Sequence, residues 1–272
     1  MEHYLWLIPL GFVVGAYGTL IGAGGGFALM PVLLMLYPKE SPEILASISL
    51  AVVFCNALSG SLAYGRMQRI DYKSGLLLSA ATLPGAIVGA LNTSYIPRRL
   101  FDAVFGILMV IVSVFIVSRP ERENLKEDGS KGKWFKRTIV DGDGTQYTFS
   151  YNLTSGLIVS LFVGYLSSLL GIGGGIIHVP VLCNFLGFPV HIATATSHFI
   201  LAVMSLAGTL VHVSTGTFSH GLHRTIALGL GVLLGAQLGA FLSNRVRGLW
   251  IIRGLSMALG FVGIRIFLSS IK

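Results

Sequence analysis

The sequence carries little charge for its length. Of its 272 residues, 11% are charged and 53% are hydrophobic, whereas an average soluble domain has about 25% charged residues. Apolar runs of roughly 17 to 22 residues recur along nearly the whole chain, and a run of that length can cross a hydrocarbon core of about 30 Å. These features exclude an ordinary soluble domain and predict an all-α polytopic membrane protein.

Acidic residues are nearly absent from the apolar runs. Of the eleven Asp and Glu, six lie in one polar stretch, four lie outside the spans, and only Asp102 approaches a span, near its end. A charged residue at the bilayer midplane is costly and usually marks a cation or proton pathway. The scarcity therefore disfavours a cation carrier or a carboxylate-based proton pump, and it favours an anion or a neutral solute.

Cysteine and catalytic signatures are scarce as well. Cys55 and Cys183 fall in apolar segments, so they indicate small buried side chains rather than a disulfide or a metal site. The spans contain no aspartate pair, no zinc-binding His–Glu–His helix and no Ser–His arrangement. We therefore expect no enzyme, no catalytic residue, no metal and no cofactor. The net charge of +8 does not indicate nucleic-acid binding, because nearly all Lys and Arg lie in loops or at span ends.

The sequence contains one glycine-proline motif that occurs twice. "GAGGGFALMPVLL" begins at Gly22 and "GIGGGIIHVPVLC" begins at Gly171, which is 149 residues later. Other pairs keep an offset between 148 and 150, such as "LSGSLAY" from Leu58 with "LAGTLVH" from Leu206. The pattern predicts an internal repeat of two homologous halves. Whether the halves are parallel or inverted stays open at this point.

The repeat divides the chain into three parts. We expect residues 1–118 to form the first transmembrane repeat and residues 151–272 the second. Each repeat has one glycine-broken or re-entrant segment followed by three long transmembrane helices. The broken segments are predicted at 5–37 and 154–187, and the other spans at 44–64, 73–92, 98–118, 191–213, 223–243 and 248–269.

A charged linker, residues 119–150, joins the two repeats. It holds seven Lys or Arg and six Asp or Glu, and its basic residues favour the cytoplasmic side. Its "DGDGTQYTF" stretch, which begins at Asp141, has the turn chemistry of a small hairpin.

The two glycine clusters are the main candidate site. Their apolar flanks place them at membrane depth, where unwound backbone is tolerated only if it is buried in protein or lines a wet cavity. Free peptide N–H groups and the positive end of a following short helix suit an anion, and secondary transporters place substrate sites in this way. Close helix packing is the alternative, and it is favoured for "GAIVGA" and "GAQLGA". The candidate residues are Gly24, Gly25, Gly26, Gly173, Gly174 and Gly175.

Polar side chains in the spans are suited to complete such a site with neutral donors. Ser49 and Asn56 are seven residues apart and share a helix face, and Thr196 with Ser197 is the equivalent place in the second half. For each of them an interhelical hydrogen bond is the alternative. His178 is also suited to be a proton-linked switch. The candidates are Ser49, Asn56, His178, Thr196, Ser197 and Gln237.

Six stretches together resemble the sulfite exporter TauE/SafE family of membrane permeases. They are "GAGGGFALMPVL", "GIGGGIIHVPVL", "NALSGSLAYG", "TSHFILAVMSLAGTL" and the "GAxxGA" spans, and they cover both halves but not the linker. The resemblance implies a multi-pass protein of the inner membrane. It also implies the transport, expected to be export, of a small sulfur-containing oxyanion such as sulfite or an organosulfonate.

We therefore expect the anion to bind at the interface of the two repeats, near the glycine-broken helices. A passive anion or small-solute channel, built from the same paired half-helices, is the alternative. The expected partners are the small anion and the lipid bilayer, with no nucleic acid. The oligomeric state is open, and a homo-oligomer is compatible with the sequence.

Overall fold

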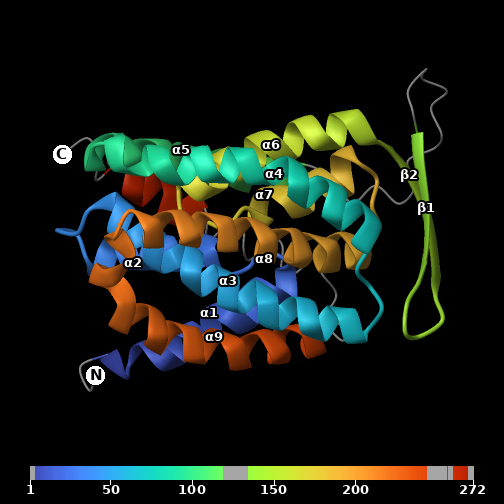
Figure 1. Ribbon diagram of the computed structural model, residues 1–272, viewed down its shortest axis with the longest axis horizontal. Helices are drawn as coiled ribbons and strands as arrows, with labels where there is room; N and C mark the ends of the chain where they lie inside the picture. Colours follow the sequence, from blue (N-terminus) through green and yellow to red (C-terminus); the bar gives the residue numbers. More distant parts are fainter. Residues whose placement is uncertain (1–3, 119–133, 244–255, 257–259, 269–272) are drawn as a thin grey trace.

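The computed structural model describes residues 4–118, 134–243, 256 and 260–268. Most of these residues are helical, and the long helices lie roughly parallel to one another, with a two-stranded hairpin standing across one end (Figure 1). Within the described residues strands occur only in this hairpin, which begins in the linker where the sequence predicts it. Most of the span predicted at 248–269 lies outside the described residues.

The helices follow the predicted spans closely. Among the described residues, four helical stretches are long and apolar enough to cross a membrane, namely α3, α4, α8 and α9, the last preceded by a short 3₁₀ turn. The first half holds α1 (Leu7–Ile21), α2 (Gly26–Leu36), α3 (Pro42–Arg66), α4 (Tyr72–Asn92) and α5 (Arg98–Ser118). The second holds α6 (Leu153–Leu169), α7 (Gly175–Pro180), a π-helical turn η3 (Val181–Phe185), α8 (Val190–Ser214) and α9 (Leu222–Leu242).

Short polar side chains begin several of these helices. Ser41 accepts a hydrogen bond from the backbone N–H of Ile44 and precedes the N-terminal proline of α3. Asp71 and Asn152 cap α4 and α6 in the same way. Such caps satisfy N–H groups that have no partner within the helix. The cap residues therefore fix where each of these helices begins.

The glycine-broken helices pack on the other half of the chain. α1 lies along α9, where Gly11 sits on Leu228 and Gly239 sits on Ala16. α6 lies along α4, where Gly85 sits on the backbone of Leu161. An added Cβ at any of these glycines would clash with the facing backbone. This confirms the close-packing interpretation of the "GAIVGA" and "GAQLGA" spans.

The two broken segments enter from opposite ends of the bundle. In both of the helix pairs above, residue numbers rise together along the contact, so α1 is parallel to α9 and α6 is parallel to α4. α3 is parallel to α9 but antiparallel to α8 and, across a short turn, to α4. Hence α1 and α6 run in opposite directions. Each enters one end of the bundle, breaks at its glycines and returns as α2 or α7 (Figure 1).

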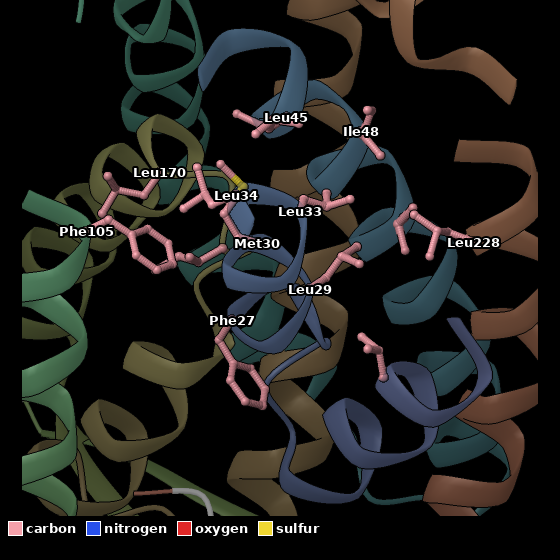
Figure 2. Close-up of a cluster of buried hydrophobic side chains, with 14 of the residues drawn as sticks. Phe27, Leu29, Met30, Leu33, Leu34, Leu45, Ile48, Phe105, Leu170 and Leu228 are labelled. Atoms are coloured by element: carbon pink, nitrogen blue, oxygen red, sulfur yellow. The ribbon is translucent and has the colours of Figure 1, made fainter. Parts of the chain in front are cut away.

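The returning helix α2 is apolar on all sides, and its residues from Gly26 to Leu34 are buried or partly buried. Figure 2 shows Phe27, Met30 and Leu33 surrounded by side chains from α3, α5, α9 and the end of α6. Phe27 is 1% exposed, and Met30 and Leu33 are fully buried. A helix that is hydrophobic all round belongs in such an interior. The core is therefore centred on the first broken segment.

The linker forms a hairpin that docks on the bundle. Strands β1 (Trp134–Val140) and β2 (Gln146–Asn152) pair antiparallel around a turn in the "DGDGT" stretch, which confirms the predicted hairpin. The Arg137 guanidinium donates to the carboxylate of Asp71, with Nη2 2.7 Å from Oδ1. Gly142 donates its N–H to the carbonyl of Met67. The hairpin is thus fixed to the α3–α4 turn.

The charge of Asp71 is held by this contact. Its side chain is fully buried, and burial alone would raise the pKa of the carboxyl. Hydrogen bonds from Arg137 and Ser74 outweigh burial and lower the pKa below its ordinary value of 3.8. Because the carboxylate form is favoured in the folded state, the ion pair stabilises the fold at neutral pH.

Replacing Arg137 with Ala should lower the free energy of unfolding by about 1 to 3 kcal/mol, because it leaves a buried carboxylate without its partner. Lys136→Ala, on the exposed face of the same strand, is the matched control and should change little. Unfolding in detergent, followed by circular dichroism, measures both.

The same pair gives a pH dependence with a defined sign. The difference between wild type and Arg137→Ala should be full at neutral pH and shrink as the pH falls through the higher pKa that Asp71 has without Arg137, towards the lowered pKa that it has in the wild type. A difference that does not change between neutral and acid pH would contradict this account of the contact.

Candidate functional site

Both broken segments unwind through glycines in the left-handed region. Such φ angles are strained for residues with a side chain. In each segment two of the three clustered glycines have this conformation, and the last one begins the returning helix. The φ angles are 73° at Gly24, 79° at Gly25, 74° at Gly173 and 77° at Gly174.

The two breaks lie directly against each other. A Cβ added to Gly26 would come within 2.5 Å of the carbonyl oxygen of Ile172. A Cβ added to Gly175 would come within 2.5 Å of the Cα of Ala23. The third glycine of each cluster is therefore required for close approach to the other break. The structure brings all six predicted glycines into one place at the centre of the bundle.

Only part of the unwound backbone is satisfied within its own segment. The N–H groups of Ala23 and Gly24 both donate to the carbonyl of Gly18, at 2.8 and 3.1 Å. In the part of the chain that the structure describes, the N–H groups of Gly25 and Gly26 donate no hydrogen bond, and the same holds for Gly174 and Gly175. Free N–H groups at the start of α2 give this point a positive potential.

Two predicted serines hold the breaks together. Ser49 donates its hydroxyl to the carbonyl of Gly171, at 2.5 Å, and Ser197 donates to the carbonyl of Gly22, at 3.2 Å. Each serine lies on a long helix of one half and binds the break of the other half. Their hydroxyl protons are therefore used for positioning the backbone. Their roles as ligands stay predictions.

Asn56 is the predicted side chain that places an unpartnered donor beside the first break. Its Oδ1 accepts a hydrogen bond from the Thr19 hydroxyl at 3.0 Å, whereas its Nδ2 has no partner and is buried. That nitrogen lies 3.5 Å from the position that a Cβ on Gly25 would take. The Thr19 hydroxyl is also 3.3 Å from Nε2 of His198. Thr19, Asn56 and His198 form a connected polar cluster, named the first-break cluster below.

The other predicted residues have partners away from this cluster. Nε2 of His178 lies 3.3 Å from the hydroxyl of Ser160 on α6. Thr196 accepts a hydrogen bond from the N–H of Asp71 at 3.0 Å, near the hairpin. Gln237 donates from α9 to Ser59 on α3 at 2.8 Å. Thr196 and Gln237 thus form interhelical hydrogen bonds. His178 lies on α7, three residues after the last glycine of the second break.

Sequence reasoning did not single out Thr19 or His198 as site residues. His198 lies in the middle of a predicted span, where an ionisable residue is a functional hypothesis by default, so its position was an available signal. Thr19 had no such signal, because a hydroxyl within a helix most often bonds its own backbone. Only the contact between α1, α3 and α8 brings the cluster together.

The arrangement suits an uncharged donor site. The first-break cluster and the free N–H groups offer dipoles but no fixed positive charge. Among the residues that the structure describes, no group of three or more His, Cys, Asp or Glu side chains is placed to hold a metal ion. A small anion fits these donors better than a cation does.

Comparison with known proteins gives a consistent picture. The pattern that describes the Sulfite exporter TauE/SafE family matches residues 7–266. The chain is 31% identical to "Probable membrane transporter protein YunE" of Bacillus subtilis over 98% of both chains. It is 22% identical to "Probable membrane transporter protein MJ0441" of Methanocaldococcus jannaschii over 96% of both. No solved structure was found to match it.

Removing either serine tie should cost about 1 kcal/mol of stability, because each leaves a buried carbonyl of a break without its donor. Ser49→Ala and Ser197→Ala should therefore unfold at lower denaturant or temperature than wild type. Ser61→Ala is the control on α3, since the Ser61 hydroxyl is buried and bonds no described residue. Equal stability of all three variants and wild type would show that these ties are not needed.

Proposed function

Because the chain belongs to the sulfite exporter TauE/SafE family, it is a multi-pass membrane transporter and not an enzyme, and we propose that it exports a small sulfur-containing oxyanion such as sulfite or an organosulfonate. The family description supports the sulfur chemistry. The scarcity of carboxylates in the described spans supports an anion rather than a cation.

The observation that carries the proposal is the meeting of the two glycine breaks at the centre of the bundle. Their unbonded N–H groups lie where helices from both halves converge. A tetrahedral or pyramidal oxyanion presents several acceptor oxygens to such donors. Lipid-exposed backbone of this kind would be too costly, which supports a position of the breaks inside the protein.

The opposite entry of the two broken segments supports an alternating-access mechanism. We propose that the halves are an inverted internal repeat, with residues 1–118 and 151–272 as its units. In an inverted repeat the two halves can exchange their conformations. The central site then opens first to one side of the membrane and then to the other. The basic residues of the linker, residues 119–150, support a position of the linker on the cytoplasmic side of the inner membrane.

Gly25→Leu and Gly174→Leu should each reduce sulfite or sulfonate flux by about tenfold or more, because a side chain there blocks the donors and strains the backbone. Gly216→Leu is the control, since Gly216 has a similar φ of 78° but open space around it. Flux into proteoliposomes and the amount of inserted protein are measured for each variant.

Full transport by both break variants would show that the site lies elsewhere. The kinetics then separate a transporter from a pore. Saturable flux that supports counterflow agrees with the proposal, whereas flux that never saturates would indicate a passive anion channel.

A further inference from the structure

The two breaks differ in the side chains that face them. At the first break the amide Nδ2 of Asn56 lies beside Gly25, and the asparagine is 1% exposed. At the second break the hydroxyl of Ser167, which is buried and also has no partner among the described residues, lies beside Gly174 together with the methyl group of Met204. A buried amide donor without a partner costs stability unless a ligand satisfies it. Both breaks thus have an unpartnered donor beside them, and the donor at the first break is an amide, which offers two N–H groups to an anion.

The residues that pack on Gly60 of α3 and on Gly208 of α8 also differ in polarity. Gly60 of α3 packs against the imidazole ring of His198, whereas Gly208 of α8 packs against the aliphatic side chain of Leu50. His198 is fully buried, and it connects to Asn56 through the Thr19 hydroxyl. An ionisable group thus lies one hydroxyl away from the unpartnered amide. The second break also has a buried histidine, His178, whose Nε2 lies 3.3 Å from the hydroxyl of Ser160, but no unpartnered amide lies beside it among the described residues.

The surroundings of His198 are oxygen acceptors and one aromatic ring. The ring faces Tyr64 edge-on at 5.5 Å, and the backbone carbonyls of Gly22 and Thr194 lie near it. The Tyr64 hydroxyl donates its hydrogen bond to the carbonyl of Thr19. Within the described residues no Asp, Glu, Lys or Arg faces the imidazole from α1, α3 or α8. His198 is the side chain of the cluster that can take up a proton.

An anion in this buried site needs a compensating charge. Dipolar donors alone hold a dehydrated anion at a high cost, and the cluster has no fixed cation. We propose that the anion binds at the first break together with one proton, which His198 carries, while Asn56 and the N–H groups of Gly25 and Gly26 hold the anion. This inference rests on the proposed function and adds the co-bound ion and the stoichiometry, one anion and one proton per chain.

Proton-coupled binding has a measurable signature that is independent of transport. The probe is methanesulfonate, because its sulfonate stays ionised at every pH used and the proton must then be taken up by the protein. Calorimetric titration in two buffers of different ionisation enthalpy gives the protons bound per anion. Wild type should take up about one proton, and its affinity should rise by up to about tenfold per unit fall in pH above the pKa of the free site.

His198→Gln keeps a polar side chain of similar length and should bind the anion without proton uptake and without this pH dependence. His212→Gln is the matched control, because His212 is fully buried on the same helix but lies 14 residues further along. It should take up the proton as wild type does. Asn56→Leu should weaken binding by about tenfold, whereas Met204→Leu at the second break should not.

The outcomes separate the two proposals. If wild type binds neither methanesulfonate nor sulfite, the proposed function is wrong. Binding by wild type without proton uptake would overturn the present inference alone, and this test does not depend on the folding of any variant. Proton uptake that persists in His198→Gln, or loss of affinity in Met204→Leu equal to that in Asn56→Leu, would overturn it as well.

Discussion

Unwound backbone in a bilayer must find its partners inside the protein, and here each glycine break is completed by the other. Gly26 and Gly175 let the two breaks approach, and Ser49 and Ser197 each bond a carbonyl of the opposite break. Neither break is built by its own half alone. The N–H groups of Gly25, Gly26, Gly174 and Gly175 stay unbonded among the described residues after this exchange, and they are the donors of the proposed anion site.

The same dependence organises the rest of the bundle. The short helices α1 and α6 are too short to cross a membrane alone, and each lies along a long helix of the other half through glycine contacts with backbone. The returning helix α2 is enclosed by several elements (Figure 2). The hairpin adds a polar contact at one end through Arg137 and Asp71. A motion of one half must therefore change the surroundings of both breaks together.

The spans, the breaks and the hairpin turn could be predicted from sequence because they depend on local patterns: apolar length, glycine clusters and turn residues. The relative direction of the two halves could not be predicted, because the basic residues near Arg66 and Arg98 would fall on opposite sides of the membrane and so do not identify the cytoplasmic side. Side-chain roles were harder still. Ser49 and Asn56 share a face of α3, but they have different neighbours. Ser49 donates to a backbone carbonyl of the second break, whereas Asn56 accepts from Thr19 of α1 and its amide nitrogen stays without a partner. Thr19 and His198 become neighbours only through packing between the halves.

The central claim is that peptide N–H groups of the first break and the amide of Asn56 bind the transported anion. Selenate is a tetrahedral oxyanion whose selenium scatters anomalously, so a crystal structure of the protein with selenate locates the bound ion directly. The account predicts one anomalous peak per chain, within hydrogen-bonding distance of Asn56 Nδ2 and the N–H groups at the start of α2. A peak confined to the basic ends of the bundle, or equal peaks at both breaks, would contradict it.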